Sequence, residues 1–173
     1  MKNYLENIII RETYESDLIN VMNLWNNGEV MKFVGFPDGL GYTVDKIKDW
    51  YKRNKESKFF THFSIYSSKV GYCGETGYGV AKSDDRNIGL DIKLLPHVHG
   101  KGIAEHALRF IITEVKRTKV ADSVWVDPHI DNEKAIKLYK KLGFIDKEFP
   151  DYLLHEDDGK HKYMELLIKE YKK

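Results

Sequence analysis

The part of the chain that most constrains the fold is residues 87–104, where a strand-like run leads through a glycine-containing loop into a helix. Apolar residues occupy positions 88, 90, 92 and 94, and this period of two indicates a β-strand. From Ile103 onward the apolar residues recur every three or four positions, which indicates an amphipathic α-helix. A half-buried strand and an amphipathic helix each need a second layer for their apolar face, so the segment predicts a mixed α/β or α+β domain.

The rest of the chain supplies further elements of the same kinds. Ser16 and Thr43 are candidate N-caps of two helices, and Gly143 is placed to end the last one. Additional strands are expected at 8–10, 59–67, 69–81, 123–126, 144–149 and 163–168, and additional helices from 17 to about 28, at 44–54 and at 132–142. The sequence contains no internal repeat and no linker, so residues 1–173 are expected to form a single domain.

Composition and charge exclude several classes of function. The 28 Lys and Arg are balanced by 27 Asp and Glu, so no net charge attracts nucleic acid or membranes. Cys73 is the only cysteine, which fits a reducing compartment, and its strand-like surroundings make it an expected core residue. No apolar run approaches the roughly 20 residues of a membrane helix, and the first residues lack the apolar stretch of a signal peptide. We expect a cytoplasmic protein that binds neither nucleic acid nor membrane.

The loop before the helix at Ile103 has the composition of an anion site. Glycines at positions 100 and 102 allow backbone N–H groups to approach a phosphate closely, and the helix that follows presents unpaired N–H groups in its first turn. The nucleotide P-loop needs Ser or Thr after its lysine, whereas Lys101 is followed by Gly102. The dinucleotide fingerprint needs Gly or Ala where this chain has Glu105. Both nucleotide interpretations therefore fail.

The same loop resembles the coenzyme A loop of the Gcn5-related N-acetyltransferase (GNAT) superfamily. Gly100 and Gly102 match its pattern Gln/Arg-x-x-Gly-x-Gly/Ala, while His97 and His99 stand where Gln or Arg is usual. The resemblance implies a GNAT fold, with a mixed, mostly antiparallel central sheet of six to seven strands and about four helices. It also implies acetyl-CoA as co-substrate, and the segment's candidate binding residues are Leu94, Leu95, His99, Gly100, Lys101, Gly102, Ile103 and Ala104.

A second motif follows at the expected interval. Residues 132–144 resemble the family pattern Asn-x-x-Ala-x-x-x-Tyr-x-x-x-Gly-Phe at every named position. The resemblance implies that Asn132 contacts the pantetheine arm, that Ala135 keeps the helix slim where the cofactor passes, and that Tyr139 protonates the departing thiolate. Asn132 and Tyr139 are seven residues apart and share one helix face. A plain helix cap for Asn132 and a core position for Tyr139 are the alternatives.

The family also implies a base for the amine and an oxyanion contact. Asp91 lies on the polar face of its strand and is the candidate base, with an ordinary surface carboxylate as the alternative. Many family members place a Glu near position 87, where this chain has Asn87. Leu94 and Leu95 lie where the family's strand splays from its neighbour, and a free backbone N–H there would bond the acetyl carbonyl.

The acceptor amine is left open by the sequence. A small-molecule, aminoglycoside-like acceptor is favoured by resemblance to aminoglycoside 6′-N-acetyltransferases and by the acidic run 156–158, which is equally well explained as a solvated turn. Ribosomal-protein N-acetyltransferases are similar too, so a peptide acceptor held by the loop 33–41 is an alternative. A non-catalytic acyl-CoA sensor is a third. The seven histidines match no metal-ligand spacing, so no metal is expected, and either a monomer or a homodimer is compatible with the sequence.

Overall fold

A computed structural model describes residues 7–57, 60–80 and 86–172 of the protein. The chain forms two compact units, the first from residues 1–78 and 91–111 and the second from residues 79–90 and 112–173. Strand β4 (Asn87–Leu94) and helix α4 (Ile103–Thr118) are each divided between the two units, β4 after Leu90 and α4 after Ile111. The expectation of a single domain stays a prediction.

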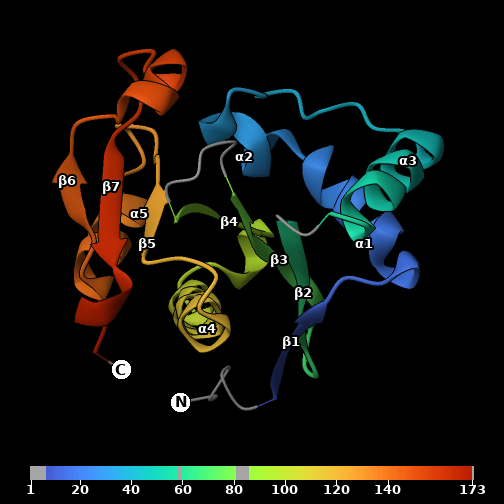
Figure 1. Ribbon diagram of the computed structural model, residues 1–173. Helices are drawn as coiled ribbons and strands as arrows, with labels where there is room; N and C mark the ends of the chain where they lie inside the picture. Colours follow the sequence, from blue (N-terminus) through green and yellow to red (C-terminus); the bar gives the residue numbers. More distant parts are fainter. Residues whose placement is uncertain (1–6, 58–59, 81–85, 173) are drawn as a thin grey trace. The chain divides into compact units, whose positions relative to one another are not determined.

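Seven strands form one sheet in the described part of the chain, in the order β1-β2-β3-β4-β5-β7-β6. β4 and β5 run parallel, whereas β1–β2, β5–β7 and β6–β7 are antiparallel. This mostly antiparallel sheet confirms the predicted fold class (Figure 1). The remaining strands are β1 (Ile8–Glu12), β2 (Phe60–Ser67), β3 (Gly71–Val80), β5 (Ser123–Val126), β6 (Ile145–Lys147) and β7 (Tyr163–Leu167).

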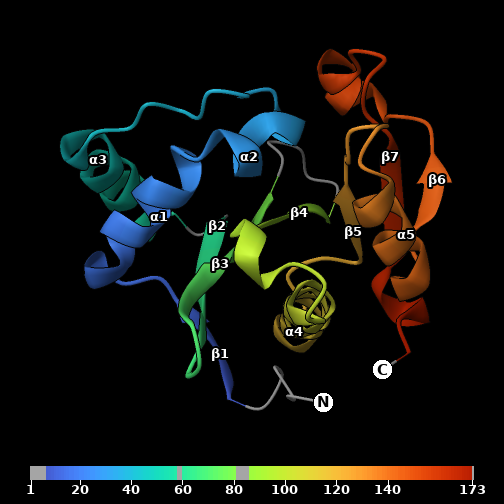
Figure 2. The same ribbon diagram turned by 180° about the vertical axis from the view of Figure 1, so that it is seen from behind.

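In the first unit, helices cover both faces of the strands. Helices α1 (Leu18–Trp25) and α3 (Val44–Lys55) form an apolar cluster on one face, joined by Met31 from the short α2 (Gly28–Met31). The beginning of α4 packs on the other face, where Ile103 and Ala107 join Ile65 and Cys73 in a second cluster. Figures 1 and 2 show these helices on opposite sides of β2 and β3. Cys73 is thus the core residue that its surroundings predicted.

In the second unit, helix α5 (Glu133–Leu142) lies beside the three strands β5, β7 and β6 (Figure 2). The side-chain oxygen of Asn132 accepts a hydrogen bond from the Ala135 N–H at 3.3 Å and caps the helix. Gly143 ends the helix in a left-handed conformation with φ 99°, which a glycine adopts without a Cβ clash. Both helix ends therefore follow the sequence signals.

At the other helix starts the outcome is mixed. Thr43 caps α3, with its hydroxyl accepting from the Lys46 N–H at 3.4 Å, as predicted. Ser16 is not a cap, because it lies inside a 3-10 turn (Glu15–Asp17) that precedes α1. The carboxylate there belongs to Asp17, which accepts from the Tyr14 N–H and the Arg11 guanidinium, both at 2.7 Å. The short α2 was not predicted, and the predicted strand ends at Phe59 and Ala81 lie outside the described residues.

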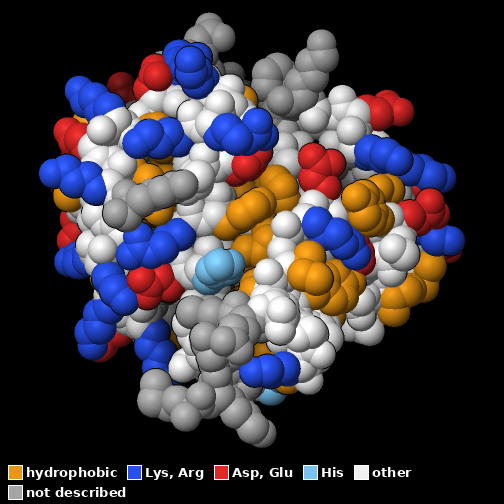
Figure 3. Space-filling view, turned by 90° about the horizontal axis from the view of Figure 1, so that it is seen from below, with side chains coloured by type: hydrophobic (Ala, Val, Ile, Leu, Met, Phe, Trp, Pro, Cys, Tyr) orange, Lys and Arg blue, Asp and Glu red, His pale blue; other side chains and the backbone are white. Residues whose placement is uncertain are grey.

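Charges of both signs are mixed on the surface. On the face drawn in Figure 3, Lys and Arg side chains are interspersed with Asp and Glu. Among the residues described here, no helix has the length and apolar character needed to cross a membrane.

Candidate active site

The glycine loop of the first unit has the geometry of an anion cradle. Gly100 and Gly102 adopt φ values of 72° and 78°, and the imidazole of His99 lies 3.1 Å from the Leu94 carbonyl oxygen. Helix α4 begins directly after the loop, so the N–H groups of its first turn have no acceptor within the helix. Because N–H donors and the positive end of the helix dipole stabilise a negative charge, the loop fits a phosphate or pyrophosphate group.

The backbone N–H of Leu95 is already engaged. It donates to the carbonyl oxygen of Cys73 on β3 at 2.9 Å. At Gly74, with φ 150°, an added Cβ would lie 2.1 Å from the Lys93 carbonyl oxygen, so only glycine permits this close approach of β3 and β4. The prediction of a free N–H at Leu95 for the acetyl carbonyl is therefore wrong. The N–H of Leu94 remains a prediction.

Asp91 is exposed on β4 and has a cationic neighbour. Its side chain is 55% exposed and forms an ion pair with Lys93, whose own side chain is only 13% exposed. The backbone carbonyl of Asp91 accepts from the Thr76 hydroxyl at 2.8 Å, which holds the strand in place. The Asp91 carboxylate is thus accessible to a cation from solvent, as its predicted role as the base for the amine requires. The Lys93 ammonium competes with such a cation for the carboxylate.

A buried carboxylate, Glu75 on β3, was missed by the sequence reasoning. Its side chain is 1% exposed, and it accepts from the Trp25 indole N–H at 2.6 Å. The Nε2 atom of His62 lies 2.9 Å from its other oxygen, and the Lys93 ammonium lies 3.5 Å from the first. The only signal in the sequence is a lone Glu in the middle of a strand-like run, where burial is expected.

Burial and neighbouring charges have opposite effects on the pKa values of Glu75 and Lys93. Burial alone would raise the pKa of Glu75, but the charges of His62 and Lys93 and its two hydrogen bonds outweigh it and lower that pKa. Burial would likewise lower the pKa of Lys93, but the carboxylates of Asp91 and Glu75 raise it above its ordinary value. Both groups are therefore charged at neutral pH, and each depends on the other's charge.

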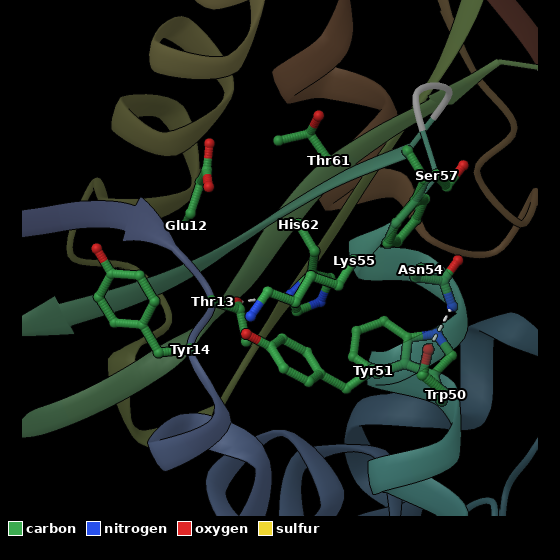
Figure 4. Close-up of a pocket in the computed structure, with 11 residues that line it drawn as sticks. Glu12, Thr13, Tyr14, Trp50, Tyr51, Asn54, Lys55, Ser57, Thr61 and His62 are labelled. Atoms are coloured by element: carbon green, nitrogen blue, oxygen red, sulfur yellow. Dashed lines mark hydrogen bonds between the residues drawn. The ribbon is translucent and has the colours of Figure 1, made fainter.

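A pocket of about 340 Å³ lies in the first unit, and one member of the polar cluster, His62, reaches it (Figure 4). His62 lines this pocket, and its Nδ1 atom lies 2.7 Å from the hydroxyl of Thr13. Trp50 and Tyr51 of α3 form an aromatic wall, with the Trp50 and His62 ring centroids 5.0 Å apart. Since both ring nitrogens of His62 already have protein partners, His62 serves to anchor Glu75.

The second unit holds the residues of the later motif. Tyr139 is 8% exposed, and its ring packs 5.5 Å from that of Phe144. Asn132 uses its side-chain oxygen as the helix cap, which leaves its amide N–H₂ as the donor for a ligand. Ala135 lies in the first turn of α5. Asn132 thus caps the helix and Tyr139 lies in the core, as the alternatives stated. Both positions are compatible with the cofactor contacts predicted for these residues.

A neutral polar cluster surrounds Asn87 in the second unit. The Asn87 amide nitrogen lies 3.0 Å from the Tyr152 hydroxyl and 2.8 Å from the Tyr163 hydroxyl. Its oxygen accepts from the Ser123 hydroxyl at 2.8 Å. Burial raises the pKa of Tyr163, so its hydroxyl stays protonated. At the position where the family resemblance implied a carboxylate, this chain therefore has an amide with three hydrogen-bond partners.

The acidic run near the C-terminus is used within its own turn. Asp157 accepts from the Gly159 N–H at 3.1 Å, and Asp158 accepts from the Lys160 N–H at 2.8 Å. A hydrogen bond from His161 lowers the pKa of Asp158. The solvated-turn interpretation is favoured. The side chains of His155 and Glu156 lie outside the described part of the chain.

The histidines are placed without a metal-binding pattern. His129 and His161 face each other with ring centroids 5.3 Å apart, and they form an isolated antiparallel bridge. No group of three or more His, Cys, Asp or Glu side chains able to hold a metal ion occurs in the ranges that the structure describes.

The chain combines a mostly antiparallel seven-stranded sheet with a glycine loop whose geometry fits a phosphate group. The sequence model of the acetyltransferase (GNAT) domain matches residues 7–145, and the chain belongs to this family. As a member of this family it is an acetyl-CoA-dependent N-acetyltransferase, with acetyl-CoA as co-substrate and an amine as acceptor. The resemblance drawn from the two motifs is confirmed.

Solved structures share this fold at low sequence identity. The spermidine N-acetyltransferase of Vibrio cholerae, in complex with CoA and spermine, aligns with a TM-score of 0.80 and 19% identity over 96% of this chain and 98% of that chain. A GNAT acetyltransferase from Streptococcus pneumoniae aligns with a TM-score of 0.75 and 15% identity over 93% and 99%. A domain from Methanocaldococcus jannaschii gives 0.74 and 17% over 93% and 98%.

Proposed function

We propose that the protein acetylates a small, positively charged amine such as a polyamine or an aminoglycoside. The observation that carries the proposal is the exposed carboxylate of Asp91, which lies on the strand that leads into the glycine loop of the same unit. An acceptor ammonium has a favourable partner there. The likeness in fold to a spermidine N-acetyltransferase supports this class of acceptor.

The chain's own groups can hold the co-substrate. In this proposal the backbone amides of residues 99–104 bind the pyrophosphate of acetyl-CoA, as the positive φ values of Gly100 and Gly102 permit. The Leu94 N–H binds the acetyl carbonyl, and the Asn132 amide binds the pantetheine arm. Lys101 adds a positive charge beside the loop. Ile103 is buried and anchors the start of α4.

Two proton transfers complete the proposed reaction. An amine with a pKa near 10 is only about 0.1% neutral at pH 7, so the reaction benefits from a base that takes the proton of the amine before it attacks the thioester carbonyl. Asp91 holds the ammonium and receives its proton, directly or through a water. The hydroxyl of Tyr139 donates a proton to the thiolate that leaves. Cys73 takes no part, because it is buried in the core.

The test is turnover of acetyl-CoA with a panel of amines: spermidine, an aminoglycoside, free lysine and peptides with a free N-terminus. Faster turnover of the small polycations than of the peptides is expected. Gly102→Glu should abolish acetyl-CoA binding in calorimetry, because it adds bulk and negative charge to the cradle. Full binding by that variant would remove the loop from the cofactor site. Binding without turnover of any amine would favour the sensor hypothesis.

One observation favours a peptide acceptor as second candidate. Val34 and Phe36, in and after a short 3-10 turn, are 43% and 47% exposed, and such apolar side chains suit contact with a peptide. The loop is anchored nearby, because the Leu40 N–H donates to the Trp25 carbonyl at 2.9 Å. Preferential turnover of the peptides in the panel, lost in Phe36→Ser, would establish this function instead.

A further inference from the structure

We propose that Glu75 is a specificity-determining positioning residue, which holds the Lys93 ammonium so that one negative charge at Asp91 remains for a cationic acceptor. The inference rests on the proposed function and extends it to a buried residue that does not touch the substrate. All of its contacts lie within the first unit. Its partners come from α1, β2 and β4, so three elements converge on one side chain.

The geometry shows an ammonium shared by two carboxylates. Lys93 forms an ion pair with Asp91 and lies 3.5 Å from Glu75, which is the buried one of the two. The two carboxylates, Asp91 and Glu75, and the one ammonium, Lys93, together carry a single net negative charge. Because Glu75 cannot reach solvent, that charge is available to a ligand only at Asp91, whose side chain is 55% exposed.

Without Glu75 the net charge of the cluster changes. The Lys93 ammonium would have Asp91 as its remaining carboxylate partner, and the pair would be neutral toward an approaching cation. The acceptor would then have to displace Lys93 before binding. Glu75 prevents this by giving Lys93 a second partner in a medium of low polarity, where ion pairing is strong. The inference thus predicts an effect on acceptor binding from a residue that is out of its reach.

Other charged and titratable groups around Glu75 have their own partners. Asp17, on the same side of the sheet, is paired with Arg11 and accepts from the Tyr66 hydroxyl at 2.6 Å. Burial raises the pKa of Tyr72, the neighbour on β3, so that phenol is neutral.

The experiment measures spermidine binding by calorimetry, and acceptor KM where turnover is found, for four proteins. These are the wild type, Glu75→Gln, Lys93→Met and the double variant. Gln keeps the shape and can still accept from Trp25 and bond to His62, so the fold is preserved. We expect the Kd for spermidine to rise roughly tenfold in Glu75→Gln, less so at high salt, since one unit of charge is lost near the ligand.

The double variant is the decisive arm. Removing Lys93 in the Glu75→Gln background returns the cluster to one negative charge at Asp91, so the affinity should recover to near that of the wild type. A purely structural role would make the double variant worse. Asp49→Asn, which neutralises an exposed carboxylate on α3, and Ser64→Ala, which removes a buried hydroxyl bonded to Thr13, should leave the affinity unchanged.

The outcomes separate the two proposals. A wild-type enzyme that turns over no amine overturns the proposed function, whatever the binding data show. An active enzyme whose Glu75→Gln variant keeps the wild-type Kd and KM overturns only the role of Glu75. Loss of affinity in Glu75→Gln without recovery in the double variant, or no spermidine binding by the wild type, overturns it as well.

Discussion

The two halves of β4 carry polar clusters of different kinds. In the first unit, Asp91 and Lys93 meet the buried Glu75, and the cluster is held together by charge. In the second unit, the side chain of Asn87 bonds to two tyrosine hydroxyls and a serine hydroxyl. The first cluster therefore depends on charge, and through it on pH and salt, whereas the bonds of Asn87 join an amide to hydroxyl groups.

This difference has an energetic basis. A buried ion that loses its partner keeps its full desolvation penalty, whereas an amide or hydroxyl that loses one hydrogen bond costs far less. Substitution within a charged cluster is therefore strongly destabilising, but the cluster can attract a charged ligand. Substitution within a neutral cluster costs less stability, but the cluster attracts no ion. The division would suit the function we propose, in which the acceptor is a cation and acetyl-CoA binds largely through backbone amides.

The largest effect is expected from Glu75→Ala. Loss of the carboxylate leaves the Trp25 indole N–H without its acceptor, removes a hydrogen-bond partner of His62 and removes a counter-ion of Lys93. The free energy of unfolding should fall by about 3–5 kcal/mol, as when one partner of a buried ion pair is removed. Urea denaturation measures this, with Ser64→Ala as a control for loss of a buried hydrogen bond alone. A fall no greater than the control's would show that charge does not hold this cluster together.

The same site predicts a pH dependence of stability. The pKa of Glu75 is lowered in the folded protein, so its ionised form stabilises the fold above the unfolded pKa of about 4.3. This contribution is lost as the pH falls through the folded value. The difference in the free energy of unfolding between the wild type and Glu75→Gln should therefore be largest near neutral pH and should shrink as the pH falls. Denaturation curves at several pH values test it, and a gap that widens in acid would reverse the sign we assign.

A smaller effect, on rate rather than stability, is expected from Tyr139→Phe in the second unit. Its hydroxyl is a neutral acid, and a thiol with a pKa near 8.5 leaves fairly well without help. We expect kcat to fall roughly 10–100-fold, with acetyl-CoA affinity and the melting temperature nearly unchanged. Steady-state kinetics and calorimetry provide the measurements. A full-rate Phe variant would remove the acid role, and early unfolding would make Tyr139 a structural residue.

Asn87→Ala should destabilise the neutral cluster only modestly. Three hydroxyl groups lose a partner, and the free energy of unfolding should fall by about 1–2 kcal/mol. Because no partner changes its charge, the loss should be the same from roughly pH 5 to pH 8, in contrast to Glu75. Denaturation at both ends of that range decides the point. A pH-dependent loss would erase the distinction between the two clusters.

The smallest effect is expected at an exposed ion pair of the second unit. Arg86 and Asp122 are 2.7 Å apart, but their side chains are 55% and 73% exposed. Solvent and salt screen such a pair, so Asp122→Asn should leave the denaturation midpoint unchanged within error. A clear shift would show that surface charge also matters in this unit.

Much of the fold and part of the site follow from local sequence. Thr43 and Asn132 cap their helices, Gly143 ends the last one, and the glycines of residues 100–102 take the conformations that an anion loop needs. Each of these depends on partners within a few residues, so the signal is contained in a short window. The two motifs and the spacing between them were enough to predict the family.

Tertiary structure decided where each carboxylate and each N–H found its partner. The partners of Glu75 lie from 13 to 50 residues away in sequence, and the Leu95 N–H pairs with the Cys73 carbonyl across two strands. Ser16, the predicted N-cap, lies instead inside a 3-10 turn, where the hydrogen bonds from Arg11 and Tyr14 go to the carboxylate of Asp17. Hydrogen bonds and ion pairs act over a few ångströms of space, and only the folded chain determines which distant groups come that close.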